Sequence, residues 1–568
     1  MTPEVTVLMS VFNGEKYLRE SIDSILNQTF SDFEFLIIND GSTDSSRKII
    51  LSYDDSRIIL VDNNENSGLS KSLNIGIHRG QGEYIARQDA DDVSHPKRLE
   101  KELQFLRNNL DYTVVGCCIN IINHKSRITA SINKPLSNES IHKVLKRNNC
   151  IAHGSVLLRK RSLFEVGLYD ESLGAAQDYD LFLRLSEKYK LANLSYHLYS
   201  WRDWKGNVSF QNRQLQRLCV KIAQDECWRR KQNSFGNFNN NQTSSISDSK
   251  PQFSLLMANY NNADTVSEAI QSVMDQTFDD WELIIVDDCS DDKSVHIITE
   301  FLNDRRVHFM RNKRNIGYIA TLENMISMSS AEIFGILDSD DVLFTDALEI
   351  MFDAHEKNSN CGLIYSQFMF CDNNLKPISL GFSRSIPKGS SNIKDSHSCA
   401  FRTFKREFFD RTDGFDQEIL YAEDWDIVLK MEEVAPILFV DKLLYKHRIC
   451  PNSQSNDPLY KRIGHLSYII AKHKAYHRRS RTEVPTLSRY AMSVELFRGF
   501  IIALRLFKWV QAWTYFKEAV KLNPLLFISL IDYLMMKIMI RTKRYFDPHY
   551  IPPFPLLKKI NNNSLSRD

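Results

Sequence analysis

The segment that decides the fold of this chain is an apolar run that ends in carboxylates and small residues, and it occurs twice. Residues 27–44 read NQTFSDFEFLIINDGSTD, and residues 275–292 read DQTFDDWELIIVDDCSDD. In each copy the apolar run has the length of a buried strand, and the residues after it favour a turn. A period of about 250 residues is far longer than that of a solenoid repeat, so the pattern predicts a duplicated domain.

Other landmarks recur in the same order, at offsets of 246 to 249 residues. Such near-constant spacing over most of the chain supports duplication of a whole domain rather than of one motif. The matched pairs are Asn13 with Asn261, ARQDADDV (86–93) with GILDSDDV (335–342), and AQDYDLFLRL (176–185) with AEDWDIVLKM (422–431).

The repeats divide the chain into four predicted parts. Segment 231–250 is rich in Asn, Ser and Gln, which is typical of a flexible linker. The last part has no counterpart in the first copy. The predicted boundaries are 1–230 for the first domain, 231–250 for the linker, 251–475 for the second domain and 476–568 for a C-terminal helical region.

Strand-like and helix-like runs alternate within each copy, as Val5–Met9 and then Tyr17–Leu26 illustrate. This alternation predicts an α/β fold: an open, mostly parallel sheet with helices on both faces. Ligands of such sheets bind outside the carboxyl ends of the strands.

Composition excludes several classes of protein. With 43% hydrophobic and 25% charged residues, the chain is neither disordered nor fibrous. Because 72 Lys and Arg are balanced by 71 Asp and Glu, we expect no nucleic-acid partner. Ten cysteines without a Cys-x-x-Cys pair argue against a disulfide scaffold and against a zinc motif of that type.

Carboxylates follow the predicted strands in both copies. Single Asp-x-Asp patterns often only form turns or helix caps, but two copies at matching strand ends favour a binding site. Such carboxylates suit Mg²⁺ or Mn²⁺, which bind a few carboxylates together with substrate phosphates. The residues are Asp40 and the group Asp89, Asp91 and Asp92 in the first copy, with Asp288 and the group Asp338, Asp340 and Asp341 in the second.

A third acidic group opens a helix-like segment in each copy: QDYD at 177–180 and EDWD at 423–426. Acids at a helix start can complement the helix dipole or act as a general base. We expect Asp180 and Asp426 to have capping or structural roles.

The ordered motifs resemble glycosyltransferase family 2, the inverting transferases with the GT-A fold, over about four-fifths of the chain. No single motif would be specific, whereas the ordered set is. The motifs in the first copy are SVFNGEKYLRESIDSILNQTF, INDGSTD, NSGLSKSLNIGI, ARQDADD, GLYDESL and QDYDLFLRL; those in the second are ANYNNADTVSEAIQSVMDQTF, VDDCSDD, NIGYIATLENM, LDSDD, GFDQEI and EDWDIVLKM.

The resemblance implies a role for each matched residue. Asp178 and Asp424 would be general bases that deprotonate an acceptor hydroxyl, and Asp91 and Asp340 would ligate Mn²⁺ or Mg²⁺ at the donor diphosphate. The nucleotide-sugar, commonly a UDP-sugar that supplies a hexosyl or N-acetylhexosaminyl group, would contact Asn13, Asp40 and Asp89 in the first copy and Asn261, Asp288 and Asp338 in the second.

The chain also departs from the family pattern. A Glu usually precedes the base, as Glu423 does, but the first copy has Gln177. Many members carry a metal-contacting His at the positions held here by Trp204 and Cys450. Two further differences between the copies are Cys289 in place of Gly41, and Glu323 in place of Asn74.

The C-terminal region is basic, with 16 Lys or Arg against 6 Asp or Glu in residues 476–568. Its apolar stretches admit two interpretations: helices packed on the second domain, or amphipathic helices on an anionic membrane surface. No uncharged apolar run is long enough to span a bilayer, and Val5–Val11 follows the N-terminus without a signal-peptide pattern. We therefore expect a cytoplasmic protein, with peripheral contact at the inner face of the plasma membrane as the membrane alternative.

Three functional hypotheses follow. The first is a bifunctional transferase that extends a glycan or lipid-linked glycan of a surface polysaccharide, such as capsule, O-antigen or lipopolysaccharide. The second keeps one active domain and makes the other a non-catalytic acceptor-binding module. The third, a nucleotidyltransferase, is disfavoured because Ser10–Lys16 contains only Gly14 and lacks a glycine-rich basic loop for a triphosphate.

Overall fold

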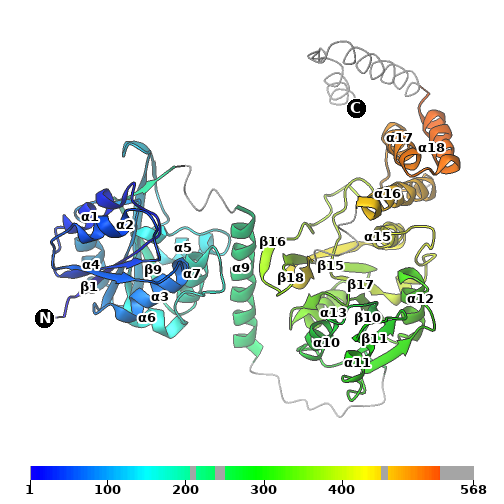
Figure 1. Cartoon of the computed structure of the whole chain (residues 1–568), viewed down its shortest axis with the longest axis horizontal. Helices are drawn as coiled ribbons and strands as arrows, with labels where there is room; N and C mark the ends of the chain where they lie inside the picture. Colours follow the sequence, from blue (N-terminus) through cyan, green and yellow to red (C-terminus); the bar gives the residue numbers. More distant parts are fainter. Residues whose placement is uncertain (1, 205–212, 237–249, 450–457, 481, 525–568) are drawn as a thin grey trace. The chain divides into compact units, whose positions relative to one another are not determined.

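The computed structural model describes residues 2–204, 213–236, 250–449, 458–480 and 482–524 (Figure 1). Cys450 and residues 525–568 of the predicted C-terminal region lie outside these ranges. The chain forms two compact units, each built around a nine-stranded sheet.

The first sheet has the strand order β3-β2-β1-β4-β8-β6-β9-β5, with β7 paired to β6. Strands β3, β2, β1 and β4 are parallel, and the register pairs Val5 with both Phe33 and Tyr84. The strands are β1 (Val5–Val11), β2 (Phe33–Asn39), β3 (Ile58–Asp62), β4 (Tyr84–Asp89), β5 (Val93–Ser94), β6 (Tyr112–Ile122), β7 (Ile128–Ile132), β8 (Leu157–Arg159) and β9 (Lys190–Arg202).

Helices cover both faces of this sheet. Val7 of β1 packs among α1, α2 and α4, whereas its neighbour Leu8 packs on the other face with α3 and α7. Full burial of such a side chain stabilises the fold by about 1.5–3 kcal/mol, which fixes the register of β1. The helical elements are α1 (Leu18–Leu26), α2 (Ser46–Leu51), α3 (Leu69–Arg79), α4 (Arg98–Asn108), α5 (Asn138–Leu145), η1 (His153–Ser155), α6 (Lys160–Val166), α7 (Gln177–Lys188) and α9 (Arg213–Gly236).

The second sheet repeats this topology in the order β12-β11-β10-β13-β17-β15-β18-β14, with β16 paired to β15. Its strands are β10 (Phe253–Asn259), β11 (Trp281–Asp287), β12 (Val307–Arg311), β13 (Ile333–Ile336), β14 (Val342–Leu343), β15 (Leu363–Cys371), β16 (Pro377–Leu380), β17 (Arg402–Lys405) and β18 (Ile437–Arg448). Its helices are α10 (Val266–Met274), α11 (Ser294–Thr299), α12 (Tyr318–Met328), α13 (Ala347–Lys357), α14 (Arg406–Phe409) and α15 (Glu423–Val434).

The predicted α/β class and the duplication are confirmed, with one difference in the sheets. Each sheet is mixed rather than mostly parallel: β4 and β6 each pair antiparallel with β8, as β13 and β15 do with β17. Helix α9 continues to Gly236, past the predicted start of the linker at residue 231. The linker is predicted from composition alone, and composition does not distinguish a polar helical end from a flexible segment.

Three further helices extend the core of the second unit: α16 (Pro458–Arg479), α17 (Arg489–Arg505) and α18 (Trp509–Leu522). Buried Arg479 ties α16 to α15, because its guanidinium donates hydrogen bonds to the Leu429 carbonyl, Glu432 and Glu433. The packed interpretation of this region therefore holds for the helices that the structure describes. None of those helices combines the length and the apolarity that a membrane span requires.

Candidate active site

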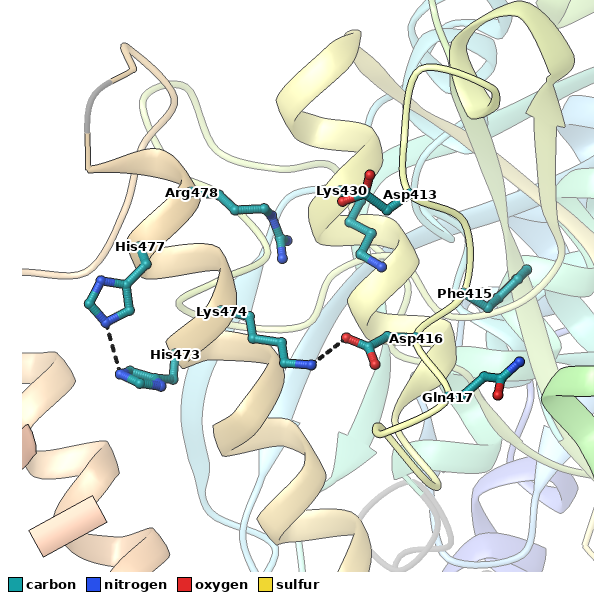
Figure 2. Close-up of a pocket in the computed structure, with 9 residues that line it drawn as sticks. All are labelled: Asp413, Phe415, Asp416, Gln417, Lys430, His473, Lys474, His477 and Arg478. Atoms are coloured by element: carbon teal, nitrogen blue, oxygen red, sulfur yellow. Dashed lines mark hydrogen bonds and ion pairs between the residues drawn. The ribbon is translucent and has the colours of Figure 1, made fainter. Parts of the chain in front are cut away.

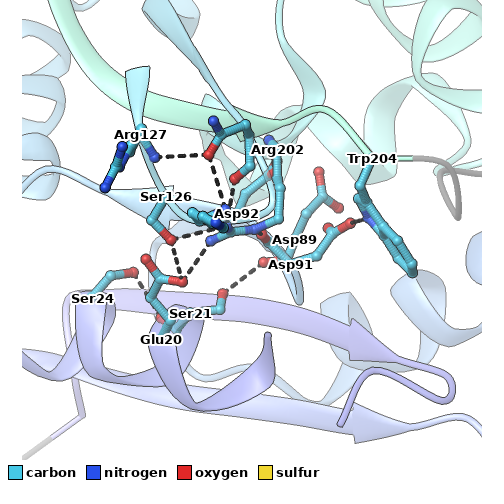
Figure 3. Close-up of polar contacts among 12 residues, drawn as sticks. Glu20, Ser21, Ser24, Asp89, Asp91, Asp92, Ser126, Arg127, Arg202 and Trp204 are labelled. Atoms are coloured by element: carbon cyan, nitrogen blue, oxygen red, sulfur yellow. Dashed lines mark hydrogen bonds and ion pairs between the residues drawn. The ribbon is translucent and has the colours of Figure 1, made fainter. Parts of the chain in front are cut away.

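The first acidic loop follows β4, and a buried arginine holds it in place. The Arg202 backbone N–H donates to Oδ1 of Asp92 at 2.7 Å, and its guanidinium donates to the Asp91 carbonyl at 2.7 Å and to Glu20 at 2.6 Å (Figure 3). Arg202 is the last residue of β9, and β9 pairs with β5 directly after the loop, so the sheet fixes the position of this loop.

The second copy repeats the arrangement almost atom for atom. The Arg448 backbone N–H donates to Asp341 at 2.7 Å, and its guanidinium donates to the Asp340 carbonyl at 2.8 Å and to Glu268. In each fold one buried arginine therefore fixes the backbone of the Asp-x-Asp-Asp loop. The side chains of Asp91 and Asp340 take no part in these hydrogen bonds.

The first copy has an indole at its predicted metal ligand. Trp204 Nε1 donates a hydrogen bond of 2.9 Å to Oδ2 of Asp91, as Figure 3 shows. The ring also meets Tyr17 edge to face. Burial, and then the charge of Asp89, raise the pKa of Asp91. An indole has a donor and no lone pair for a metal, so Trp204 can orient Asp91 but cannot join it as a ligand.

The second copy has a histidine beside its acidic loop. His447 Nδ1 lies 2.9 Å from Oδ2 of Asp341. Although burial alone would lower it, the hydrogen bond and charge of Asp341 raise the pKa of His447 to about 8. Sequence analysis missed His447 because the family pattern pointed to Cys450; the available signal was a histidine three residues earlier in the same segment.

The acids of the second loop repel one another. Burial, followed by the charges of Asp341 and Asp338, raises the pKa of Asp340 to about 7. Burial, followed by Asp341, raises the pKa of Asp338 to about 6, against the opposing charges of His447 and Arg402. Partly buried carboxyls that resist ionisation in each other's presence are the kind of donor set that a divalent cation stabilises.

Each copy has an arginine beside its acids, but the arginine comes from a different strand in each: Arg87 from β4 and Arg402 from β17. Arg87 of β4 is the cross-strand neighbour of Val156, and the backbone N–H of Arg87 donates to the Val156 carbonyl at 2.9 Å. In the second sheet the equivalent positions hold Ile336 and Arg402, as the register of β13 and β17 shows.

The exchange changes the partner of the guanidinium. Arg87 Nη2 lies 2.7 Å from Oδ1 of Asp89, whereas Arg402 Nη2 lies 2.7 Å from Oδ2 of Asp424. In the first copy it neutralises the acid at the strand end; in the second it pairs with the predicted base.

The predicted bases are the second residues of α7 and α15. In place of a guanidinium, Asp178 accepts a hydrogen bond of 2.7 Å from the neutral Asn149 amide. Left-handed residues introduce both helices, with Ala176 at φ 55° and Tyr421 at φ 64°. Such strain costs on the order of 1–3 kcal/mol and is often found at functional sites.

The residues next to the bases differ as the sequence indicated. Burial, and then the charge of Asp424, raise the pKa of Glu423 to about 7; Gln177 cannot titrate. Asp180 pairs with Arg184 at 2.7 Å, and Asp426 pairs with Lys430 at 3.0 Å, each within its own helix. These two buried pairs agree with the structural role expected for Asp180 and Asp426.

The structure ties Asn13 and Asn261 into loops. Asn13 Oδ1 accepts a hydrogen bond from the Thr43 N–H at 2.8 Å, and Asn261 Oδ1 accepts one from the Asp291 N–H at 2.9 Å. Both residues have left-handed φ angles, 50° and 55°, which asparagine tolerates better than most residues. Each amide joins the loop after the first strand of its sheet to the loop after the second.

Asp40 and Asp288 are also committed to loops. Asp40 Oδ1 accepts from Asn63 at 2.8 Å and from the Ser67 N–H at 2.9 Å, while Oδ2 accepts from the Gly68 N–H at 2.9 Å. Asp288 is bound in the same way by Asn312, Ile316 and Gly317. A nucleobase that contacted either carboxylate would share oxygens that already hold the loop in position.

The remaining sequence differences change the loops around the sites. Gly41 has a φ of 69°, and a Cβ there would lie 2.5 Å from the Glu65 backbone; Cys289 takes the same conformation at φ 66° with a side chain. Asn74 is buried and clamps Tyr169 through its amide, whereas exposed Glu323 contacts Gln417 at 3.2 Å.

Comparison with known families covers both copies of this site. The model of "Glycosyl transferase family 2" matches residues 6–168 and 254–412, more than half of the chain. The chain belongs to glycosyl transferase family 2. Both family-matched regions contain the Asp-x-Asp-Asp loops, and both end before α7 and α15, so the predicted bases rest on the motifs and the geometry.

Similar proteins carry glycosyltransferase names. An uncharacterized glycosyltransferase of Rickettsia bellii is 28% identical over 392 residues, 63% of this chain and 56% of the relative. The putative glycosyltransferase EpsE of Bacillus subtilis is 33% identical over 211 residues, 35% of this chain and 73% of EpsE. The chain spans between 56% and 64% of the length of the Rickettsia relatives it matches over both copies.

Among solved structures, Staphylococcus aureus TarS residues 1–349 in complex with UDP-GlcNAc is similar at 16% identity, with a TM-score of 0.39. The similarity covers 48% of this chain and 81% of that one.

Proposed function

We propose that the chain is a glycosyltransferase that moves sugars from nucleotide-sugar donors, UDP-sugars in the first instance, onto a glycan or lipid-linked glycan acceptor with inversion. The observation that carries this proposal is the duplicated site. In each copy an acid at the end of the fourth strand and an acid at a helix start act electrostatically on the same third side chain. The charges of Asp89 and Asp178 both act to raise the pKa of His153, and those of Asp338 and Asp424 both act to raise the pKa of Tyr318.

Asp91 and Asp340 would hold a divalent cation, Mn²⁺ or Mg²⁺, through carboxylate oxygens. The raised pKa of each carboxyl, caused first by burial and then by neighbouring acids, fits a site that gains stability from a bound cation. Such a cation, when bound, neutralises the charge of a departing nucleoside diphosphate. Arg202 and Arg448 would keep the loop backbone in register while the leaving group forms.

Asp178 and Asp424 would accept the proton of the acceptor hydroxyl. A base placed on the side of the sugar opposite the diphosphate gives inversion at the anomeric carbon, since the hydroxyl attacks from that side. The two bases differ in their neighbours: Asn149 donates to Asp178, and Arg402 donates to Asp424. Arg402 would have to release or share Asp424 as the proton arrives.

A second candidate function is a protein with one active domain, the second. Two contacts favour it: Trp204 donates to the metal carboxylate of the first copy, and His447 binds Asp341 in the second. In this variant the first domain binds the acceptor or an earlier part of the glycan. Gln177, where the second copy has Glu423, points in the same direction.

Membrane contact through the C-terminal region belongs to the same proposal, because a lipid-linked acceptor of a surface polysaccharide lies at the inner face of the plasma membrane. Exposed apolar side chains cluster where α17 meets α18: Phe507 is 78% exposed, Trp509 64%, Val510 84% and Trp513 56%. Lys508 lies between the first two. Aromatic and basic residues side by side suit an anionic bilayer surface.

The membrane part is tested by sedimentation with vesicles of phosphatidylglycerol and phosphatidylcholine. We expect the wild-type chain to bind anionic vesicles, and Trp509→Ser with Val510→Ser to reduce the bound fraction severalfold. Equal binding of this double variant and the wild type would remove the membrane from the proposal.

The transferase proposal is tested by nucleotide release from a panel of nucleotide-sugars with Mn²⁺ and crude lipid acceptors. Asp91→Asn and Asp340→Asn are compared singly with the wild-type chain. Loss of release from a different donor in each variant supports two active domains. Loss in Asp340→Asn alone supports the second candidate. If the wild-type chain turns over no donor, the transferase proposal is wrong.

A further inference from the structure

Two histidines lie one helical turn apart on α16, outside both acidic sites. His473 and His477 are four residues apart, so their rings project from the same side of the helix. Their Nε2 atoms lie 2.9 Å apart, as Figure 2 shows, and the rings meet edge to face with centroids 4.6 Å apart. A hydrogen bond between two imidazole nitrogens needs one N–H and one lone pair, so at least one ring is neutral.

A carboxylate from another helix completes the group. Glu518 of α18 offers an oxygen that lies within 4.8 Å of the ligand nitrogens of both His473 and His477. Within residues 2–524 as far as they are described, no other three His, Cys, Asp or Glu side chains come together in this way.

Neighbouring cations are already engaged elsewhere. Lys474 donates to Asp416 at 2.6 Å, and Arg478 donates to Glu433 at 2.7 Å; Figure 2 shows Lys474 reaching away from the two histidines toward Asp416. Lys521 Nζ lies 3.7 Å from a carboxylate oxygen of Glu518, and the Lys521 side chain is 75% exposed. Exposed ion pairs of this length are weak, so Lys521 competes poorly with a divalent ion.

We propose that His473, His477 and Glu518 form a Zn²⁺ site that fastens α16 to α18. Two imidazole nitrogens and one carboxylate oxygen are a common zinc donor set, and water can take the fourth position because the cluster lies at the surface. Zn–N bonds of 2.0–2.1 Å in a tetrahedral site place the nitrogens about 3.3 Å apart. The two rings need only a small separation from their present contact to reach this spacing.

The donor atoms also decide between metals. Mg²⁺ and Mn²⁺ prefer oxygen, whereas imidazole suits zinc and the late transition metals. This site is therefore chemically distinct from the carboxylate sites of the two sheets.

The expected consequence is structural. His473 and His477 belong to α16, which packs on α15, while Glu518 belongs to α18 near the end of the described chain. A metal that binds only when both helices are in place stabilises their packing by mass action. The proposal is independent of the transferase function, because its test measures zinc binding rather than sugar transfer.

The test is a Zn²⁺ titration of the full-length protein after chelator treatment, in competition with a chromophoric chelator and with excess Mg²⁺ present to fill oxygen-rich sites. The variants are His473→Gln, His477→Gln and Glu518→Gln. His465→Gln, an exposed histidine on the same helix, is the matched control. Far-UV circular dichroism of the metal-free proteins checks that each variant is folded.

We expect wild type and His465→Gln to bind one zinc equivalent. The three cluster variants should either not bind this zinc or bind it at least about 100-fold more weakly. Zinc should raise Tm in the first two proteins only, and Co²⁺ should give the visible absorption of a tetrahedral site in them. His477 is exposed, so His477→Gln decides the matter even if His473→Gln fails to fold. Equal stoichiometry and affinity in wild type and His477→Gln would overturn the proposal.

Discussion

The indole Nε1 of Trp204 donates a hydrogen bond of 2.9 Å to Oδ2 of Asp91, across 113 residues of sequence. The contact occupies one oxygen of the carboxylate that the family pattern assigns to the metal. The second copy has no equivalent contact among its described residues, because Cys450, the matching residue, lies outside them. The residue at this position therefore differs in type between the copies: Trp204 in the first and Cys450 at the matching position of the second.

Replacement of Trp204 by histidine should strengthen metal binding in the first copy. An imidazole can offer a lone pair where the indole offers only a donor, so Trp204→His should lower the Mn²⁺ dissociation constant by about tenfold. The measurement is Mn²⁺ binding in an Asp340→Asn background, which isolates the first site. Trp204→Phe is the control: it removes the hydrogen bond without adding a ligand, and an equal gain in this variant would show that relief of the indole contact is sufficient.

Loss of the helix-start carboxylates should slow transfer without weakening donor binding. Asp178→Asn and Asp424→Asn keep the shape of the side chain and remove its basicity, and a positioned base contributes about 10²–10⁴-fold to such a step. We expect acceptor-dependent turnover to fall by that factor in the affected domain. Calorimetry with the nucleotide-sugar should give dissociation constants within about twofold of wild type; a large loss of donor affinity would instead assign these carboxylates to the donor site.

The left-handed conformation of Cys289 predicts a stabilising substitution. A side chain at φ 66° costs about 1 kcal/mol or more relative to glycine, so Cys289→Gly should raise the free energy of unfolding of the second unit by about 1 kcal/mol. Cys289→Ala removes the sulfur but keeps the strain, and should give no gain. Urea unfolding of the three proteins provides the comparison, and destabilisation by the glycine would mean that the Cys289 side chain contributes more through packing than it costs in strain.

A buried histidine predicts acid sensitivity of the second unit. His355 is fully buried, its Nε2 lies 2.9 Å from Thr403 Oγ1, and burial lowers its pKa to about 3. The unfolded chain takes up a proton here below about pH 6.5 and the folded chain does not until about pH 3. The free energy of unfolding therefore decreases as the pH falls from about 6.5 to about 3. The equilibrium constant for folding falls by up to about tenfold per pH unit in this range.

The measurement is the urea midpoint of wild type and His355→Gln at pH 7.5 and pH 5. We expect the variant to lose less stability than wild type between the two values, whatever its stability at pH 7.5. His465→Gln, whose histidine is exposed in both states, should follow wild type. A wild-type slope in His355→Gln would mean that other groups cause the acid sensitivity.

Much of the site could be predicted because its parts are local in sequence. Asp40 directly follows the strand Phe33–Asn39 and Asp89 is the last residue of the strand Tyr84–Asp89, and the carboxyl end of such a strand lies at the ligand-binding edge of the sheet. Asp178 and Asp424 lie at the start of amphipathic segments, which is also a local feature of the sequence. The duplication made each of these interpretations firmer, since the same residue types recur at matching strand and helix ends.

For other residues the sequence does not reveal the contacts made within the fold, and their assignment to the nucleotide-sugar stays a prediction. Asn13 and Asp40 were assigned to the nucleotide-sugar, and in the structure their polar atoms bind neighbouring loops. An asparagine that clamps a loop and one that contacts a ligand have the same sequence pattern, because both follow a strand and precede a turn. His447 was overlooked for a related reason: its partner Asp341 is 106 residues away.

By itself, the sequence determined the duplication, the α/β class and the placement of carboxylates at strand ends, because these follow from periodicities within single segments. Only the tertiary structure decided which groups face those carboxylates. The register of β4 on β8 and of β13 on β17 makes positions 87 and 156, and positions 336 and 402, cross-strand neighbours, so that Arg87 meets Asp89 in the first copy and Arg402 meets Asp424 in the second. Register depends on packing between strands that are far apart in the chain. The pattern of residues within one segment therefore does not predict it.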